Sequence, residues 1–511
     1  MTSAENTPSA EPAEAGDVLH SGAAGGKVIR GGVIRTAGFG VGILFGLGTS
    51  ALLLRHLGVV EYGKYGTIAA LLGLVLALSD GGLTTIGARE LSTTREGSAR
   101  ARVASTLMLV RLVTTTIGVL IAIGFAIFAY SSAQLTLGAA LVGGSVVLIS
   151  LQAMSLVPLL VTLRIAPMTT FEILRHALTF VGVLVLVLAE AGLEWFFALQ
   201  VPIAAVLLLL TVIYVRRSFP IGIRADKAAA FRLARETLPL AVASTMIVLY
   251  GGAMVIIVSL IATEYQTGLF VTSARIMEVV VGLPGLVIAL ALPVLSVASA
   301  TDHARLRNAL QLMIELGLVL SALVAVTLAL ASSAVIDLIG GLAFAEATPI
   351  LQVQAFAIIG VFVSQTLQNA LISLRRQQTL VLTNAIALAA VVVFGVVLVS
   401  RFGAIGGAYA IVAAEALLVT LLVLTLRRQA PQVLPSLRFS WKVAACLAVA
   451  AAAGLIPLPS TWFNALIGGS AFLVVAFALR AIPGELAVAL AGPVWGEERV
   501  RGVLRRYYGA A

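Results

Sequence analysis

Long apolar segments separated by short polar connectors run along nearly the whole chain. Many exceed the roughly 20 residues that a helix needs to cross a bilayer. Their hydrophobicity is continuous and does not alternate, which argues against a transmembrane β-barrel. The pattern therefore predicts an all-α polytopic membrane protein with about fourteen transmembrane helices. We place them at 33–54, 65–86, 104–130, 135–163, 171–189, 195–215, 237–261, 269–298, 308–332, 350–374, 379–399, 404–426, 441–456 and 462–480.

Composition agrees with this pattern. Of 511 residues, 60% are hydrophobic and 11% are charged, whereas a typical globular protein has roughly 25% charged residues. The mean hydropathy is +1.08. The net charge of +10 would raise the question of nucleic acid in a soluble protein. Here the basic residues sit in short loops between spans, so we expect no nucleic-acid partner. The single cysteine, Cys446, makes neither a disulfide within the chain nor a cysteine metal site.

The positions of Lys and Arg test the predicted topology, because cytoplasmic loops carry an excess of them. With the N-terminus placed in the cytoplasm, nearly all of the 33 basic residues fall on the cytoplasmic side. The exceptions are Arg55, Lys64 and Arg401 outside, and Arg111, Arg175 and Arg275 within spans. One miscounted span would place the later basic connectors on the wrong side of the membrane and remove this asymmetry. We therefore predict that both termini are cytoplasmic.

A short internal repeat divides the chain into two lobes. The pairs Glu61-Tyr62 and Glu264-Tyr265 each follow the first span of a half, and six spans separate them. An even number of spans gives both halves the same orientation, which predicts a parallel repeat. The expected parts are a disordered cytoplasmic tail at 1–26, an N-lobe with spans 1–6 at 27–226, a C-lobe with spans 7–12 at 227–430, and spans 13–14 with a basic tail at 431–511.

Several of these segments carry a family resemblance. The connector Leu57-Gly58 to Tyr62-Gly63, the span end Asp80-Gly81-Gly82-Leu83 and the pair Arg89-Glu90 resemble the N-terminal signature of bacterial polysaccharide-unit flippases. The eighth span is also similar to that family, with Arg275 near its start and Leu283-Pro284 at its centre. It closes with Leu292-Pro293-Val294-Leu295-Ser296. These flippases are the Wzx-type members of the multidrug/oligosaccharidyl-lipid/polysaccharide (MOP) exporter superfamily.

The resemblance implies a V-shaped cavity between two lobes and transport by alternating access. It implies a polyprenyl-pyrophosphate-linked oligosaccharide as substrate, flipped from the inner to the outer leaflet of the bacterial cytoplasmic membrane. The setting would be biosynthesis of a surface polysaccharide, either lipopolysaccharide or exopolysaccharide. Partners would be membrane lipid, a polysaccharide polymerase and glycosyltransferases.

Arg275 and Glu278 are the most conspicuous candidates for a substrate site. They are three residues apart and share one helix face, at a membrane depth where each charge costs roughly 2.5–3.5 kcal/mol. A guanidinium matches the oxygens of pyrophosphate, so Arg275 would bind the phosphates, and Glu278 would either orient it or take up a coupling cation. The alternative is a self-neutralising pair. Both interpretations place the pair inside the bundle and not against lipid.

Three further charges lie at or within spans. Arg111 is either a cation at the inward mouth of the cavity or an arginine that reaches the interface. Glu415 is mid-span, so it is protonated, paired across helices, or part of ion coupling. Asp80 is either a coupling-ion site or a helix-end residue beside two glycines. We expect Glu415 and Asp80 to be the coupling candidates.

A polar cluster on the tenth span supplies candidate sugar contacts. Gln365 and Gln368 lie on one helix face, and Asn369 is beside Gln365. The alternative is that these side chains form hydrogen bonds between helices.

Other chemistries find no support in the sequence. No phosphate-binding Gly-Lys-Ser/Thr loop is present, which argues against ATP hydrolysis. The four histidines are scattered, and the external connectors are too short for a catalytic domain. We therefore expect a transporter and not an enzyme, with no catalytic residue, cofactor or metal. The alternatives are a drug or small-cation exporter of the same superfamily, a fourteen-span exporter of the major facilitator type, and a non-transporting scaffold of an envelope-synthesis complex.

Overall fold

The computed structural model describes residues 22–94, 97–130, 132–162, 164–217, 219, 227–301, 303–374, 376–436, 439–456 and 460–481. These residues form α-helices joined by short turns and two 3-10 segments, and no strand occurs among them. The predicted tail at 1–26 lies outside the described part except for 22–26, which begin the first helix. The predicted basic C-terminal tail lies outside it beyond residue 481.

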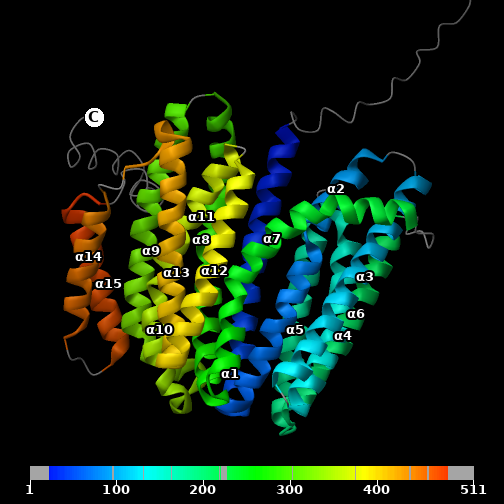
Figure 1. Cartoon of the computed structure of the whole chain (residues 1–511), viewed down its shortest axis with the longest axis horizontal. Helices are drawn as coiled ribbons and strands as arrows, with labels where there is room; N and C mark the ends of the chain where they lie inside the picture. The colour runs from blue at the N-terminus through cyan, green and yellow to red at the C-terminus, as the bar shows by residue number, and fades with distance from the viewer. Residues whose placement is uncertain are drawn as a thin grey trace, which may run out of the picture.

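Two groups of helices stand side by side (Figure 1). The first group contains α1 (Gly22–Asp80), α2 (Leu83–Thr93), α3 (Gly97–Tyr130), α4 (Ala133–Val161), α5 (Ile165–Leu188) and α6 (Leu193–Arg216). Its core is a cluster of buried side chains from α1, α3, α4 and α6, among them Leu72, Ala139 and Phe197.

The second group contains α7 (Lys227–Ile261), α8 (Glu264–Thr301), α9 (His303–Gly340), η2 (Leu342–Ala347), α10 (Thr348–Ala355), α11 (Ala357–Ser373), α12 (Gln377–Phe402), α13 (Ala404–Gln429) and η3 (Pro431–Val433). The last two helices, α14 (Ser440–Gly454) and α15 (Thr461–Ala478), pack together on its outer side against α9. Gly454, Gly468 and Gly469 make this packing close, since each stands against a side chain of α9.

Gly58 breaks α1 into two antiparallel halves. Its φ of 69° and ψ of 179° are not helical, and only glycine adopts such a conformation readily. The two halves therefore correspond to the first two predicted spans, 33–54 and 65–86. In the second group the equivalent turn is at Ala262 and Thr263, between α7 and α8.

These two turns meet at one end of the molecule. A Cβ atom built on Gly63 would stand 2.8 Å from the Glu264 carbonyl oxygen, and one on Gly268 would collide with the Val59 carbonyl. The backbones of the two groups therefore touch here. Lys64 reinforces the contact, with its Nζ 3.3 Å from Glu61 and 3.7 Å from Glu264. The two connectors that form the sequence repeat thus pack against each other.

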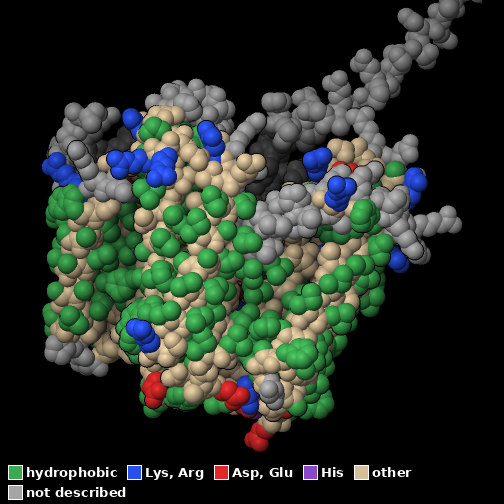
Figure 2. Space-filling model, in the orientation of Figure 1, with side chains coloured by type: hydrophobic (Ala, Val, Ile, Leu, Met, Phe, Trp, Pro, Cys, Tyr) green, Lys and Arg blue, Asp and Glu red, His purple; other side chains and the backbone are tan. Residues whose placement is uncertain are grey.

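The surface has a broad apolar belt between two polar ends (Figure 2). On the face shown in Figure 2, most Lys and Arg side chains lie at the upper end, and most of the visible acidic side chains lie at the lower end beside a few basic ones, where α1 turns back in Figure 1. Ten helical stretches among the described residues are long and apolar enough to cross a membrane. The chain is therefore a multi-pass helical membrane protein. Each of the fourteen predicted segments overlaps a helix, while the count of fourteen crossings and the side of the termini stay predictions.

Candidate functional site

A cavity of about 640 Å³, lined by both polar and apolar residues, lies between the two groups of helices. Both halves of α1 line it, together with α5, α6, α7 and α8. Small residues on α1 and α7 give it room, because no heavy atom outside their own helices comes within 4 Å of a Cβ position at Gly73 or Gly251. We call this space the central cavity.

Arg275 and Glu278 both line the central cavity. The Arg275 Nη1 is 2.5 Å from Glu278 Oε2, and its Nε donates to Ser50 Oγ at 3.3 Å. The Arg275 side chain is 41% exposed and that of Glu278 is 67% exposed. The Nη2 group of Arg275 has no protein acceptor among the described residues. The pair is thus held at one end by α1 and open to the cavity at the other.

Hydroxyl and amide groups complete the cavity wall. Thr49 and Ser50 come from the first half of α1, and Tyr62 and Tyr65 from the second half. The rings of the two tyrosines stack with centroids 6.3 Å apart. Gln200 of α6 donates to the Tyr65 hydroxyl at 3.4 Å. The cavity therefore combines one guanidinium, one carboxylate, aromatic faces and neutral hydrogen-bonding groups.

Arg111 and Asp80, which the sequence presented as separate candidates, form one ion pair. Arg111 Nη1 is 2.9 Å from Asp80 Oδ1, and Asp80 also accepts from Thr84 Oγ1 at 2.6 Å. The Arg111 residue is only 2% exposed, and its Nε has no partner within the described part of the chain. The pair joins α3 to the end of α1 and does not line the central cavity.

Glu415 is a buried carboxyl group held by two neutral donors. It is 3% exposed and accepts from the Ser364 hydroxyl of α11 at 2.5 Å and from the Tyr250 hydroxyl of α7. No cation pairs with it among the residues that the structure describes. Gly360 lets α11 approach this side chain, because a Cβ there would overlap Glu415 Cγ. The cluster links α7, α11 and α13 inside the second group.

The three polar residues predicted on the tenth span lie on α11 and make local contacts. Asn369 Nδ2 donates to the Gln365 carbonyl at 2.8 Å within the helix. Gln368 Oε1 accepts from Asn384 of α12 at 3.4 Å. None of the three is among the residues that line the central cavity. Their part in sugar binding stays a prediction.

The described residues contain no group of three or more His, Cys, Asp or Glu side chains placed to hold a metal ion. Cys446 is buried in α14.

Sequence reasoning did not find several side chains that matter here. Tyr62 lies in the first connector, Tyr65 begins the second predicted span and Gln200 lies within the sixth. Tyr250 and Ser364 are 165 and 51 residues from Glu415. The Tyr residues beside the repeated Glu residues were a usable signal, since large polar aromatics at a span end need a partner for their hydroxyl. Nothing in the sequence around Tyr250 or Ser364 indicated that their hydroxyls donate to Glu415.

Comparison with known proteins places the fold. No family model matches the chain, and no curated protein matches it in sequence. Among solved structures, it is similar to the lipid II flippase MurJ in an inward closed conformation, with a TM-score of 0.71 and 14% identity over 88% of this chain and 98% of that one. An inward-facing multidrug resistance transporter of the MATE family, in the MOP superfamily, gives a TM-score of 0.65 and 14% identity over 78% and 98%.

A MOP superfamily transporter from Pyrococcus furiosus gives a TM-score of 0.57 and 15% identity, over 83% of this chain and all of that one. At these identities the likeness concerns the fold alone. The chain therefore has the fold of MOP superfamily transporters.

Proposed function

We propose that this protein is a flippase that moves a polyprenyl-pyrophosphate-linked oligosaccharide from the inner to the outer leaflet by alternating access. The observation that carries the proposal is Arg275, whose guanidinium faces the central cavity with Nη2 unoccupied by protein acceptors among the described residues. Forked N–H donors of this kind match phosphate oxygens bidentately. A membrane setting that is partly shielded from water strengthens that attraction.

The remaining wall suits the rest of such a head group. Sugar hydroxyls need both donors and acceptors, which Thr49, Tyr65 and Gln200 supply. Glu278 balances the charge of Arg275 and is the more exposed partner of the pair. An incoming pyrophosphate would displace this carboxylate from the guanidinium. The fold shared with a lipid II flippase is consistent with a lipid-linked substrate.

Glu415 is the coupling residue in this proposal. A single buried acid with only neutral donors can take up or release a proton, or exchange the proton for a monovalent cation. No buried basic residue loses its ion-pair partner when this happens. Its donor Tyr250 is on α7, which also lines the central cavity through Val248 and Gly251. A change at Glu415 is therefore transmitted to the cavity wall through one helix. We place the protein in a bacterial cytoplasmic membrane, with glycosyltransferases and a polysaccharide polymerase as partners.

One observation favours a second candidate, export of a drug or small organic cation. Glu278 is 67% exposed in the cavity beside the stacked rings of Tyr62 and Tyr65, and aromatic faces with a carboxylate attract cations. The same fold occurs in multidrug transporters. A flippase needs the positive charge of Arg275, whereas a cation exporter needs the negative charge of Glu278. Substitution of each residue in turn therefore distinguishes the two functions.

The deciding experiment measures flipping of a polyprenyl-pyrophosphate-linked oligosaccharide in proteoliposomes. Arg275→Ala should lower the rate at least about 100-fold, equivalent to about 2.7 kcal/mol, with the protein still folded. Arg401→Ala, an exposed arginine at the end of α12, is the matched control and should keep the rate. Arg275→Lys retains the positive charge but lacks the paired N–H donors of a guanidinium, so its flipping rate should lie between those of Arg275→Ala and the unchanged protein.

A cation exporter would behave in the opposite way. Glu278→Gln would then abolish transport, and Arg275→Ala would leave it intact or raise it. A scaffold would show no flipping with any variant. In cells, depletion of the protein should make the lipid-linked oligosaccharide accumulate in the inner leaflet, and a normal lipid-linked pool with normal surface glycan would contradict the flippase proposal.

A further inference from the structure

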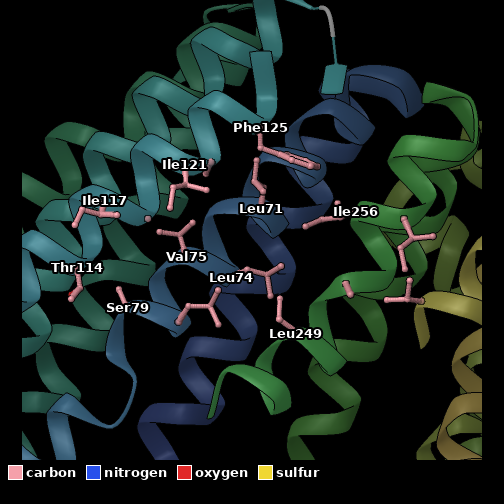
Figure 3. Close-up of a pocket in the computed structure, with 16 residues that line it drawn as sticks. Leu71, Leu74, Val75, Ser79, Thr114, Ile117, Ile121, Phe125, Leu249 and Ile256 are labelled. Carbon is pink, nitrogen blue, oxygen red and sulfur yellow. The ribbon is translucent and has the colours of Figure 1, made fainter. Parts of the chain in front are cut away.

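A second cavity, of about 580 Å³, lies on the other side of the contact between α1 and α7 (Figure 3). The second half of α1, α3 and α7 form most of its wall, and Val392 of α12 completes it. Apart from Ser79 and Thr114, the lining side chains are apolar. Ile117 and Ile121 on its rim are 52% and 67% exposed, so the cavity opens to the membrane. We call it the lateral groove.

The lateral groove and the central cavity share a wall. Leu74 lines both of them. On α7 the residues alternate between the two spaces, with Leu249 and Ala253 on the groove and Val248 and Gly252 on the central cavity. The two spaces are therefore separated by the seam between one half-helix of α1 and α7.

This seam is thin where Leu74 meets Gly252. A Cβ on Gly252 would stand 2.6 Å from Leu74 Cδ2, so the leucine side chain rests directly on the glycine backbone. Leu74 is the one side chain among the described residues that belongs to both walls, and the neighbouring Gly73 and Gly251 have open space around them. A connection between the polar and the apolar space therefore requires the contact between Leu74 and Gly252 to open.

The polar end of the groove does not offer a head-group site. Ser79 and Thr114 stand at that end (Figure 3), next to Asp80 and one turn from Arg111. The Arg111 guanidinium is buried and paired with Asp80, so a phosphate in the groove could not reach it. The groove thus has no accessible cation among its described lining residues for the head of an amphiphile whose tail fills it, and the central cavity with Arg275 lies directly across the seam.

We propose that the lateral groove holds the polyprenyl chain of the lipid whose pyrophosphate sits at Arg275, and that the lipid enters through the Leu74–Gly252 seam. The proposal rests on the proposed function, because it assigns the tail of the same substrate. From Thr114 to Phe125 the groove follows α3 for about 16 Å at 1.5 Å per residue, roughly half of the hydrocarbon thickness of about 30 Å. A flexible hydrocarbon chain fits such a slot, and the rest of the chain continues into the bilayer past Ile121.

The test uses the full chain in proteoliposomes with a polyprenyl pyrophosphate that carries a photoreactive diazirine on its prenyl chain. Adducts should map to 114–125 of α3 and 249–257 of α7, and unlabelled polyprenyl pyrophosphate should reduce them about tenfold. A phosphatidylglycerol with a diazirine on its acyl chain should instead label outward positions such as Phe128, which is 89% exposed. Equal labelling of the groove by both probes would mean a general lipid surface and would overturn the proposal.

A matched pair of variants adds a functional readout. Ile121→Trp narrows the groove, while Phe128→Trp changes a lipid-facing position of the same helix outside it. Flipping of a long-chain substrate should slow at least about fivefold in Ile121→Trp and stay unchanged in Phe128→Trp. A substrate with a chain too short to fill the groove should be flipped equally by both. Equal rates for the long chain would contradict the proposal.

The two proposals fail in different ways. Flipping that depends on Arg275, together with prenyl adducts outside the groove, would remove the tail site and leave the flippase function standing. Absence of both flipping and competed labelling would remove the flippase function itself.

Discussion

The two groups of helices bury charge in opposite ways. The first group holds Arg111 against Asp80, a complete ion pair between α1 and α3. The second holds Glu415 against two neutral hydroxyls from α7 and α11. An ion pair loses its balance when either member changes charge. An acid between hydroxyls does not, since a hydroxyl both donates and accepts. The first arrangement fixes a structure, whereas the second leaves a charge free to change.

The largest loss of folding stability is expected for substitution of Asp80, which tests the ion pair of the first group. Asp80→Ala strands the guanidinium of Arg111, which is 2% exposed, and a stranded buried charge costs about 3–5 kcal/mol. Arg111→Met should cost less, about 1–2 kcal/mol, because the Asp80 side chain is 36% exposed and keeps its hydrogen bond from Thr84. Thermal unfolding in detergent measures both.

The double variant Asp80→Ala/Arg111→Met is the control for this asymmetry. It should recover much of the stability lost in Asp80→Ala, since no unpaired charge remains. If Arg111→Met destabilises the protein more than Asp80→Ala does, the ion pair is not the fixed element that we describe.

A smaller effect on stability, with a large effect on transport, is expected at Glu415. Glu415→Gln keeps the shape and can still bond both hydroxyls, so unfolding should change by less than about 1.5 kcal/mol. Gradient-driven flipping should fall about tenfold and lose its dependence on pH or sodium, while substrate binding stays unchanged. Proteoliposomes with imposed ion gradients measure this.

Glu315→Gln is the matched control for Glu415. It changes a carboxylate on α9 that accepts from Gln311 at 2.6 Å, away from α7. If both variants keep coupled transport, the buried acid of the second group has a structural role like that of the Arg111–Asp80 pair, and the contrast between the groups disappears.

The smallest effects concern uncharged amides in the second group. Gln368→Leu removes a hydrogen bond to Asn384 at 3.4 Å and should cost about 0.6 kcal/mol. Gln354 is 2% exposed, and neither atom of its amide has a partner among the described residues. Gln354→Leu should therefore be neutral or stabilising. Thermal unfolding of both variants tests this difference in stability. An equal loss of stability in Gln354→Leu and Gln368→Leu would show that the Gln354 amide has a hydrogen-bond partner outside the described residues.

The sequence predicted the helical class, the segment pattern and the contact between Arg275 and Glu278, each for a local reason. Apolar run length defines spans, and a spacing of three residues placed Arg275 and Glu278 on one face. The fold of a MOP superfamily transporter agrees with the resemblance drawn from the connector and eighth-span motifs. The Wzx-type specificity has no such support and belongs to the proposal.

The rest depended on contacts between distant segments. Arg111 and Asp80 are 31 residues apart, and nothing in either helix indicated that they face each other. Tyr250 and Ser364 became visible as donors only when α7, α11 and α13 came together around Glu415. The lateral groove is equally hidden, because its lining residues look like any lipid-facing leucine or isoleucine until the seam with α7 separates them from the polar space.

The contact of Gly63 and Gly268 at the lower end has a consequence for the balance between conformations. In the alternating access that we propose, the two groups of helices separate at that end, and their close contact in this structure depends on both glycines, because a Cβ atom at either position would overlap backbone atoms. Each alanine introduced would act as a wedge of one carbon atom, raising the free energy of the closed form and leaving the open form untouched. Since a ligand or substitution shifts a two-state equilibrium only through such a difference, alanine at either position would favour the form in which the two groups of helices are apart.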